Sequence, residues 1–335
     1  MAFSTDPKRI ALHKVRRGVQ LSAPTFLRMF GLDFSSTKGK DLLPVFLVAL
    51  LCLIWGSTWL GIKIGLEDSP PFLSAGFRFL IATIFLYIWA KSRGIKFSNY
   101  RGQIFKILIP GFFMYYLSYS LVYWGEQYLN SGLTAVLFAT LPFFVAVYAS
   151  FLLKEERLNK FKLLGLLTGF SGIVLIFRDS LSFSGVDLLA GMVGIILSAA
   201  CSAYASVRVK RDLYSVEPIV ISTFQMGLGA LLLLGSGFLL EKLSDFKLTY
   251  KSIGALLYLS FFGSALAFMV YYWLLKKIEV TKLSLIAFIT PIVALVLGWL
   301  ILKETITKYL LSGTILVIIG IWLVTRYRTT ERSMP

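Results

Sequence analysis

Arg78 is the residue whose type and position in this sequence most demand a chemical role. It lies seven positions after Pro71 inside an apolar stretch, about 10 Å along a helix that starts at the proline. If that stretch spans a bilayer, the charge is costly unless it pairs, reaches the interface or lines a wet cavity. Two interpretations remain open. In the first, Arg78 binds an anionic or carboxylate-bearing group or pairs with a gate acid. In the second, it is a structural arginine bonded to loop carbonyls or to Glu67 or Asp68.

Other polar and aromatic side chains within apolar stretches are candidates for a solute cavity. Trp55 and Thr58 share one helix face, and Tyr116 and Tyr119 share another. The alternative is structural, since hydroxyls bond nearby carbonyls and aromatic residues form belts at membrane interfaces. The complete candidate set is Trp55, Ser57, Thr58, Arg78, Tyr116, Tyr119, Gln225, Tyr271 and Thr290.

Two prolines and two acids are candidates for helix kinks and gates. Pro142 and Pro291 each fall near the middle of an apolar stretch, where proline frees a backbone carbonyl and bends the helix. Such broken backbone can line a transport site, although it can also only shape packing. Glu155 and Glu304 each follow a lysine at a helix end. They are read either as mirrored gate residues or as solvated helix ends.

The sequence offers little for catalysis or metal binding. It contains one histidine, His13, and two cysteines, Cys52 and Cys201, which lie far apart. We therefore expect no catalytic residue, no metal and no cofactor. All 17 acidic residues lie in tails, loops or span ends, which argues against proton exchange through a carboxylate inside the membrane. Glu126, expected to be an interfacial acid at the outer end of the third span, is the one partial candidate.

These residues must be positioned by membrane helices. Hydrophobic residues make up 57% of the chain and charged residues 15%, whereas soluble domains carry about 25% charged residues. The fold class is therefore an all-α polytopic membrane protein. Ten apolar stretches are long enough to span a bilayer. They run near 42–64, 70–90, 106–125, 130–153, 161–178, 187–207, 217–240, 252–275, 281–302 and 308–325.

Basic residues indicate how the chain is oriented. There are 34 Lys and Arg against 17 Asp and Glu. With both termini in the cytoplasm, about 26 of the basic residues lie inside and seven lie in external loops. This bias follows the positive-inside rule, so the net charge does not point to nucleic acid. We expect a multi-pass protein of the bacterial cytoplasmic (inner) membrane.

An internal repeat divides the chain into two halves. Residues 112–155 match 261–304 at an offset of 149, which places Tyr123 on Tyr272 and Pro142 on Pro291. At an offset of 147, Lys63 falls on Lys210. Five helices per unit would make the two repeats inverted in the membrane, as in many secondary transporters. The expected domains are a basic, disordered arm at 1–41, five-helix repeats at 42–178 and 187–326, and a cytoplasmic tail at 327–335. Met29 is an alternative start that would exclude residues 1–28.

Several short motifs resemble those of a known family. They are Ile54-Trp55-Gly56-Ser57-Thr58-Trp59, Gly76-Phe77-Arg78-Phe79-Leu80 and Ala139-Thr140-Leu141-Pro142, with glycines in the fifth and tenth spans. Together they resemble the EamA-like family of the drug/metabolite transporter superfamily over about residues 42–326. The resemblance implies ten helices around a central cavity, alternating access, and export or exchange of small metabolites such as amino acids.

We therefore expect a secondary transporter and not an enzyme. Its partners would be a small-molecule solute and the lipid bilayer, with no nucleic acid, and it would act as a monomer or homodimer. An exchanger of anionic, phosphorylated or nucleotide-linked metabolites is the main alternative. A membrane-embedded transferase and a passive channel are more distant ones.

Overall fold

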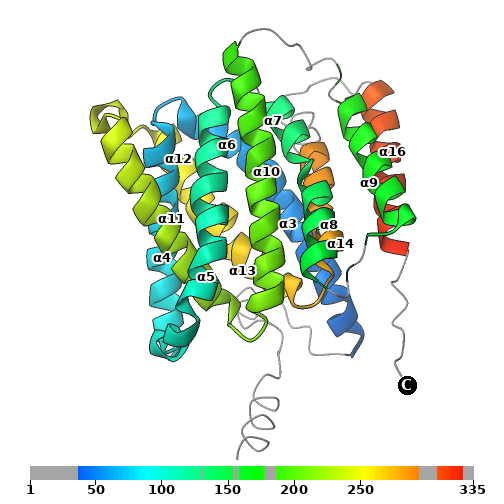
Figure 1. The fold of residues 1–335 in the computed structure, drawn as a ribbon. Coiled ribbons are helices and arrows are strands. Elements are labelled where there is room, and N and C mark those ends of the chain that lie inside the picture. Colours follow the sequence, from blue (N-terminus) through cyan, green and yellow to red (C-terminus); the bar gives the residue numbers. More distant parts are fainter. Residues whose placement is uncertain are drawn as a thin grey trace, which may run out of the picture. The chain divides into compact units, whose positions relative to one another are not determined.

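The computed structural model describes residues 37–129, 131–153, 156, 158–176, 178, 186–293 and 308–326. The chain divides into two compact units, Met1–Leu47 and Val48–Pro335. Of the first unit, the structure describes the opening turns of helix α3, which covers Thr37–Leu66. Every other element described below belongs to the second unit, and Figure 1 labels most of them along the chain.

The described residues form helices joined by turns, with no strand among them. In the first half the helices after α3 are α4 (Pro71–Ser92), η1 (Phe97–Gln103), α5 (Ile104–Gly111), η2 (Phe112–Ser118), α6 (Tyr119–Gly125), α7 (Ser131–Phe138), α8 (Leu141–Leu152) and α9 (Lys160–Ile176). In the second half they are α10 (Val186–Asp212), α11 (Pro218–Leu240), η4 (Leu243–Asp245), α12 (Tyr250–Tyr258), η5 (Leu259–Leu266), α13 (Ala267–Leu275), α14 (Val280–Ser284) and α16 (Lys308–Arg326).

Seven helical stretches are long and apolar enough to cross a membrane. They are Leu42–Leu66, Pro71–Ser92, Phe97–Gly125, Leu133–Leu152, Val186–Asp212, Pro218–Leu240 and Tyr250–Leu275. The expected fifth, ninth and tenth spans fall on shorter described helices, namely α9, Val280–Val293 and α16. The described chain is thus an all-α membrane protein, as predicted. The count of ten spans stays a prediction.

Local sequence explains where several helices begin. α4 and α11 each start on a proline, Pro71 or Pro218, after a residue with extended backbone. Proline suits this position because the first N–H of a helix has no intrahelical partner. α12 begins with a capping box, in which the Thr249 side chain accepts from Ser252 N and the Ser252 side chain accepts from Thr249 N.

The third and eighth expected spans each contain a π-helical segment. η2 joins α5 to α6, and η5 joins α12 to α13. The two segments lie at matching places in the alignment of the two halves, since Phe112 corresponds to Phe261. A π segment widens one turn and changes which side chains share a face after it, and such segments are frequent at functional sites.

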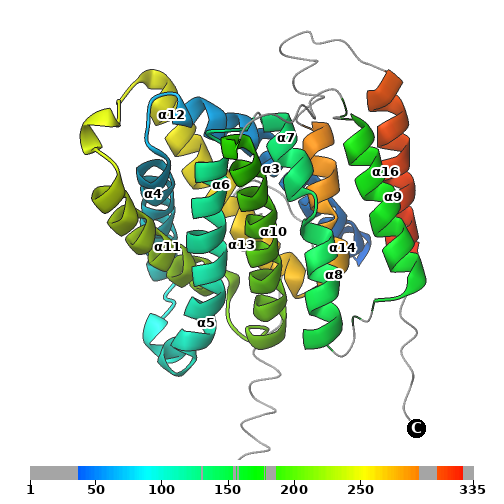
Figure 2. The same cartoon turned by 45° about the horizontal axis from the view of Figure 1, so that its top comes forward.

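Two helix pairs pack along much of their length, α4 with α11 and α9 with α16, and Figures 1 and 2 show both pairs side by side. Glu241, after α11, accepts hydrogen bonds from Phe72 N and Leu73 N at the start of α4. α4 and α11 are therefore antiparallel. We call the end with this contact the α3–α4 end and the opposite end of α11 the α10–α11 end.

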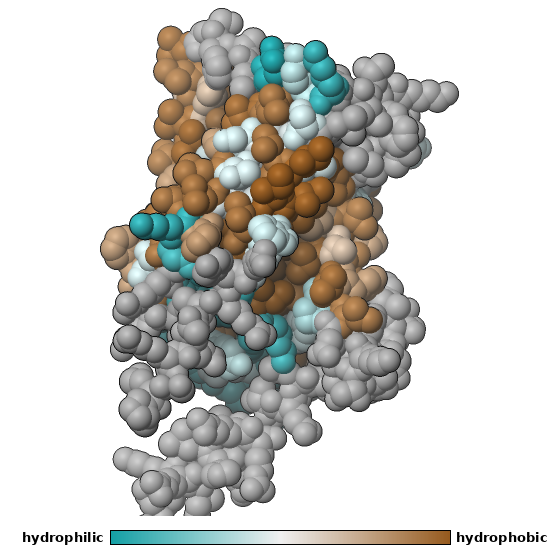
Figure 3. All heavy atoms as spheres, turned by 90° about the vertical axis from the view of Figure 1, so that its right-hand side faces the viewer, coloured by the Kyte–Doolittle hydropathy of each residue, from teal (hydrophilic) through white to brown (hydrophobic). Residues whose placement is uncertain are grey.

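The outer surface of these helices is apolar. Figure 3 faces the side on which α9 and α16 lie, where hydrophobic side chains cover most of the described surface. Leu164 and Leu167 on α9 and Ile315, Ile318 and Trp322 on α16 are all exposed there. Large apolar side chains on this scale suit contact with lipid chains, which agrees with a membrane location.

Glycines allow α9 and α16 to approach closely. A Cβ added at Gly172 would lie 2.6 Å from the backbone oxygen of Gly313, and one at Gly165 would lie 2.7 Å from that of Gly320. No real Cβ tolerates such distances, so any larger residue must push the helices apart. Close packing through small residues is a common way to join helices in membranes.

We expect Gly172→Ala to destabilise the protein by about 1–3 kcal/mol, because the added methyl overpacks this crossing. Gly235→Ala on α11 is the matched control, since a Cβ there meets no atom within 4 Å. Alanine should be neutral or favourable at that position by about 0.5–1 kcal/mol. Thermal unfolding of the purified protein in detergent measures both, and a Gly172→Ala variant that melts at or above the wild type would contradict the packing.

Candidate functional site

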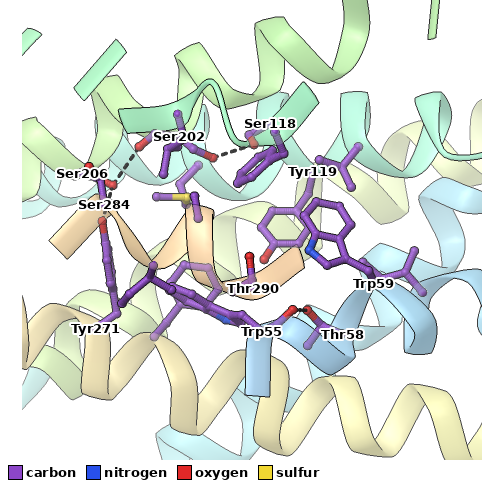
Figure 4. Close-up of a pocket in the computed structure, with 18 of the residues that line it drawn as sticks. Trp55, Thr58, Trp59, Ser118, Tyr119, Ser202, Ser206, Tyr271, Ser284 and Thr290 are labelled. Carbon is purple, nitrogen blue, oxygen red and sulfur yellow. Dashed lines mark hydrogen bonds between the residues drawn. The ribbon is translucent and has the colours of Figure 1, made fainter. Parts of the chain in front are cut away.

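A cavity with a volume of about 100 Å³ lies among the helices of the second unit. This space is large enough for several water molecules, so it can admit a small solute. Its aromatic lining is Trp55, Trp59, Tyr119, Phe138, Phe268 and Tyr271. Its hydroxyl lining is Thr58, Ser118, Ser202, Ser206, Ser284 and Thr290, and Figure 4 shows how most of these side chains surround the space.

Trp55 on α3 organises the aromatic part of the wall. Its ring centroid lies 5.3 Å from those of Phe268 and Tyr271 on α13, within the range of favourable aromatic pairs. The indole Nε1–H donates to the backbone oxygen of Gly263 at 3.3 Å. Tyr119 approaches Phe268 from α6, with 6.4 Å between ring centroids. These contacts hold flat apolar surfaces in fixed positions around the cavity.

The hydroxyl groups on α10 bond to neighbouring helices. Ser202 and Ser118 are 2.7 Å apart, and Tyr271 donates to Ser206 at 2.9 Å. Figure 4 shows these bonds on one side of the cavity. Each joins α10 to a different helix, η2 in one case and α13 in the other. The serines therefore give that side of the wall polar groups in an otherwise aromatic surrounding.

Arg78 on α4 is the one charged residue among the described residues that line the cavity. Its side chain is buried, at 1% exposure. Nε donates to Ser264 Oγ at 2.8 Å, Nη1 to the Tyr123 hydroxyl at 3.2 Å and Nη2 to the Gly263 oxygen at 3.3 Å. The guanidinium carbon lies 5.1 Å from the Tyr119 ring centroid, a cation–π distance.

No carboxylate of the described residues forms an ion pair with Arg78. The structural alternative from the sequence named Glu67 and Asp68 as partners, but these acids bond elsewhere. Asp68 accepts from the Thr249 hydroxyl, and Glu67 pairs with Lys251 at 3.4 Å. In the part of the chain that the structure describes, the Arg78 charge is thus solvated by neutral hydrogen-bonding groups and has no counter-ion, which is costly in a buried place.

The structure brings six of the nine sequence candidates to the cavity. They are Trp55, Thr58, Arg78, Tyr119, Tyr271 and Thr290. The other three bond away from it. Ser57 bonds to the Tyr258 hydroxyl, Tyr116 to Ser236, and Gln225 to Tyr272 and the Ile107 oxygen.

The two proline candidates lie next to lining residues of the cavity, and the two acid candidates lie outside the described residues. Pro142 is the second residue of α8 and directly follows Leu141, which lines the cavity. Pro291 directly follows Thr290, the corresponding lining residue of the second half. Around Pro291 the helix break lies earlier, at Leu285. Glu155 and Glu304 lie outside the described residues.

Sequence reasoning did not select several lining residues. Trp59, Ser118, Ser202, Ser206, Phe268 and Ser284 were missed. The repeat offsets contained a usable signal, because Ser202 and Ser206 correspond to Trp55 and Trp59 at 147, and Phe268 corresponds to Tyr119 at 149. Applying the offsets to each candidate would have found two of the six, Ser202 from Trp55 and Phe268 from Tyr119.

Residues paired by the alignment of the two halves make matching contacts. Lys63 at the end of α3 donates to the backbone oxygens of Glu126 and Leu129. Its counterpart Lys210 at the end of α10 donates to those of Leu275 and Ile278, the positions that correspond to 126 and 129. These two contacts lie at opposite ends of the second unit.

Arg78 and its counterpart repeat this pattern. Arg78 donates to the hydroxyl of Tyr123, and the hydroxyl of Tyr272 donates to Gln225. Gln225 corresponds to Arg78 and Tyr272 to Tyr123. In each half the second span (α4 or α11) is thus joined to the third span (α6 or α13) through a tyrosine hydroxyl, and the partner of the tyrosine is charged in the first half alone.

Contacts between the two halves gather at the α10–α11 end. Glu156, in the loop between α8 and α9, accepts from Val280 N at 2.9 Å and from Thr281 N and Oγ1 at 3.1 Å. Lys162 on α9 pairs with Glu279 at 3.3 Å, and Lys282 pairs with the same carboxylate at 2.7 Å. Although burial raises the pKa of Glu279, the bonds from Lys282 and the nearby Lys162 charge lower it overall.

Metal chemistry finds no support in the part of the chain that the structure describes. No three His, Cys, Asp or Glu side chains there gather in an arrangement that could hold a metal ion. The two cysteines, Cys52 and Cys201, are both free.

Comparison with known proteins places these features in a wider group. The model of the EamA-like transporter family matches residues 42–178 and again 189–326. Uncharacterized transporter YoaV of Bacillus subtilis (strain 168) is 31% identical over 82% of this chain and 93% of its own. Uncharacterized inner membrane transporter YedA of Escherichia coli (strain K12) is 30% identical over 77% of this chain and 83% of its own. A solved crystal structure superposes with a TM-score of 0.73 at 19% identity, covering 85% of this chain and 98% of that one, which supports the fold alone.

Proposed function

Because this chain belongs to the EamA-like transporter family, we propose that it is a secondary transporter that exports or exchanges a small, amino-acid-like metabolite by alternating access. The solute carries a carboxylate and an apolar or aromatic part. The observation that carries this proposal is a single buried cation, Arg78, on the wall of an aromatic cavity.

Arg78 suits a carboxylate ligand in charge and geometry. Its three hydrogen bonds to described residues use three of its five N–H donors, and the other two suit an anionic group. A carboxylate binds guanidinium through paired N–H bonds, and the bonds are stronger because both partners are charged. Binding a solute would also balance the otherwise unpaired charge.

The aromatic wall suits the rest of the solute. Trp55, Tyr119, Phe268 and Tyr271 surround the cavity, and flat apolar groups stack well on such rings. The hydroxyls of Ser202, Ser206 and Thr290 can bond a small polar group such as an amine. This combination favours amino-acid-like solutes over purely apolar ones.

A phosphorylated or nucleotide-linked solute fits less well. Such compounds carry two or more negative charges and are usually held by several Arg or Lys side chains. Among the described lining residues Arg78 is the one cation. Lys63, the nearest alternative in the sequence, bonds to backbone oxygens and is not among them.

We further propose that the chain has ten membrane helices arranged as two inverted repeats. Three observations support this: the family model matches twice, the π segments η2 and η5 correspond, and Lys63 and Lys210 make matching contacts at opposite ends. Inverted repeats provide two similar conformations, one open to each side of the membrane. Glu156 and the Lys162–Glu279 pair would close the α10–α11 end in one of them.

The protein is proposed to lie in the bacterial cytoplasmic membrane with both termini in the cytoplasm. The excess of basic residues on one side supports this orientation. The α10–α11 end would then face the cytoplasm. A lipid bilayer and a small solute are its proposed partners, and it would act as a monomer or homodimer.

Uptake by proteoliposomes tests the proposal. We expect one or more radiolabelled amino acids, from a panel that includes the aromatic ones, to enter in a saturable manner. Unlabelled solute on the opposite side should accelerate uptake, because a carrier exchanges and a channel does not. If no compound of the panel moves under any gradient, the proposal is wrong. Flux that rises linearly with concentration would instead favour a passive channel.

A further inference from the structure

Glu126 is a buried acid that the proposed solute site does not use. It is the first residue after α6, at the α3–α4 end, and its exposure is 0%. Among the described residues, neither Oε1 nor Oε2 finds a hydrogen-bond partner. The sequence favoured an interfacial acid at this helix end. The structure differs because α10 packs tightly here, so that a Cβ on the adjacent Gly125 would lie 3.0 Å from Ile195.

Two cations lie near Glu126 but bond to other groups. Lys63 on α3 donates to the backbone oxygens of Glu126 and Leu129, at 3.2 and 3.4 Å, and not to the carboxyl group. Arg78 on α4 donates to Tyr123, one turn before Glu126 on α6. Among the described residues no ion pair includes Glu126.

The remaining neighbours that the structure describes add no further charge at this position. α10 meets the end of α6 through Gly191 and Ile195, which are uncharged, and Asp187 at the start of α10 is exposed to solvent. The titratable groups that face Glu126 are therefore Lys63 from α3, Arg78 from α4 and Tyr123 from its own helix.

A buried carboxylate without hydrogen bonds is much less stable than the neutral acid. Burial accordingly raises the pKa of Glu126 to about 8, although Lys63 and Arg78 act in the opposite direction. In this conformation the group therefore holds a proton below about pH 8 and loses it above. Both nearby cations could pair with the carboxylate after a modest movement of the helices that carry them.

We propose that Glu126 is the proton-binding site that couples proton movement to transport. In another conformation its proton leaves to water at the α3–α4 end, and the carboxylate pairs with Lys63 or Arg78. This proposal rests on the proposed function, because Arg78 is also the group that holds the solute.

Arg78 links solute binding to the protonation of Glu126. A carboxylate solute at Arg78 and an ionised Glu126 compete for the same positive charge, so solute binding favours protonation of Glu126. By linkage, protonation favours solute binding to the same degree. Proton and solute are then carried together. An anionic solute crosses with no net charge, and a zwitterionic amino acid crosses with one net positive charge.

Infrared titration of the purified full-length protein tests the proton site without any solute. We expect the C=O stretch of a protonated carboxyl group at about pH 6, and its loss as the pH rises through about 8. The band should be absent from Glu126→Gln and retained in Glu67→Gln, which alters an exposed acid paired with Lys251. If the wild type shows no band that Glu126→Gln removes, the proposal is overturned.

Transport tests the coupling. For the amino acid that the proteoliposome panel identifies, a pH gradient should drive accumulation in the wild type and in Glu67→Gln. Glu126→Gln should lose this accumulation and keep solute exchange within about twofold, since exchange returns each proton. Glu126→Asp should accumulate solute with a shifted pH profile. Gradient-driven accumulation that survives in Glu126→Gln would overturn the coupling. If no solute moves at all, the proposed function fails, while the infrared titration still reports on the proton site.

Discussion

Replacing Arg78 with glutamine is expected to reduce transport of the carboxylate solute by about 10- to 100-fold. Hydrogen bonds between charged groups contribute about 1.5–3 kcal/mol, and each 1.4 kcal/mol corresponds to about a tenfold change in affinity. Glutamine keeps hydrogen-bonding capacity toward Ser264, Tyr123 and the Gly263 oxygen while it removes the positive charge. The loss should therefore appear in solute affinity and uptake, with the protein still folded.

Two further variants make this result specific. Arg78→Lys keeps the charge but loses the planar fork, so an intermediate loss is expected. Arg208→Gln is the matched control, because Arg208 on α10 is partly exposed and pairs with Asp212 at 2.7 Å, away from the cavity lining. Uptake in proteoliposomes measures the loss of solute binding, and size-exclusion behaviour in detergent measures whether the protein is still folded. Arg78→Gln with wild-type uptake and a normal elution profile would exclude a direct role in solute binding.

Replacing Glu156 with alanine is expected to open the α10–α11 end. The variant loses three hydrogen bonds to a carboxylate, from Val280 N, Thr281 N and Thr281 Oγ1. Such bonds contribute about 1.5–3 kcal/mol each, so the closed conformation should lose at least one order of magnitude in relative population. The Lys162–Glu279 pair remains and limits the effect.

Accessibility of a cavity cysteine measures this opening. Ser118→Cys, in a background where Cys52 and Cys201 are alanine, places a thiol on the cavity wall. A membrane-impermeant maleimide applied from the side of the α10–α11 end should label the Glu156→Ala protein about tenfold faster than its parent. Glu67→Ala, at the opposite end, should leave the rate unchanged. Equal labelling rates with and without Glu156 would show that this contact is not a gate.

The sequence pointed to the neighbour of Glu156 and not to Glu156 itself. The repeat pointed to the adjacent residue Glu155 as a gate candidate, and Glu155 lies outside the described residues. Nothing in the sequence distinguishes Glu156 as the side chain that reaches the start of α14. Two of its three donors are backbone N–H groups 124 and 125 residues away, which carry no residue-type signal, and the third is the Thr281 hydroxyl, which is equally distant in the sequence.

The two tyrosines of the third span show why shared helical spacing was insufficient. Tyr116 and Tyr119 are three residues apart, so an α-helix would place them on one face. The π segment η2 covers Phe112–Ser118, and its wider turn changes the direction of the side chains within it. As a result Tyr119 lines the cavity, whereas Tyr116 bonds to Ser236 on α11.

Arg78 was identifiable in the sequence because a charge within an apolar stretch is unusual wherever its neighbours lie. Its partners were not identifiable, since Ser264 and Gly263 are 186 and 185 residues away. In the structure Arg78 bonds to neutral groups and lies on the cavity wall. We therefore propose an anionic solute as its charged partner.

Membrane insertion, helix positions and family membership follow from short-range features of the sequence, because a run of about 20 apolar residues suffices for a span and short motifs suffice for the family. The contacts between helices depend on which faces meet, and neighbouring residues do not encode that. Glu126 is the clearest example. Its place at a helix end is local, but its complete burial results from the packing of α4 and α10 against α6 and from the approach of Lys63 on α3.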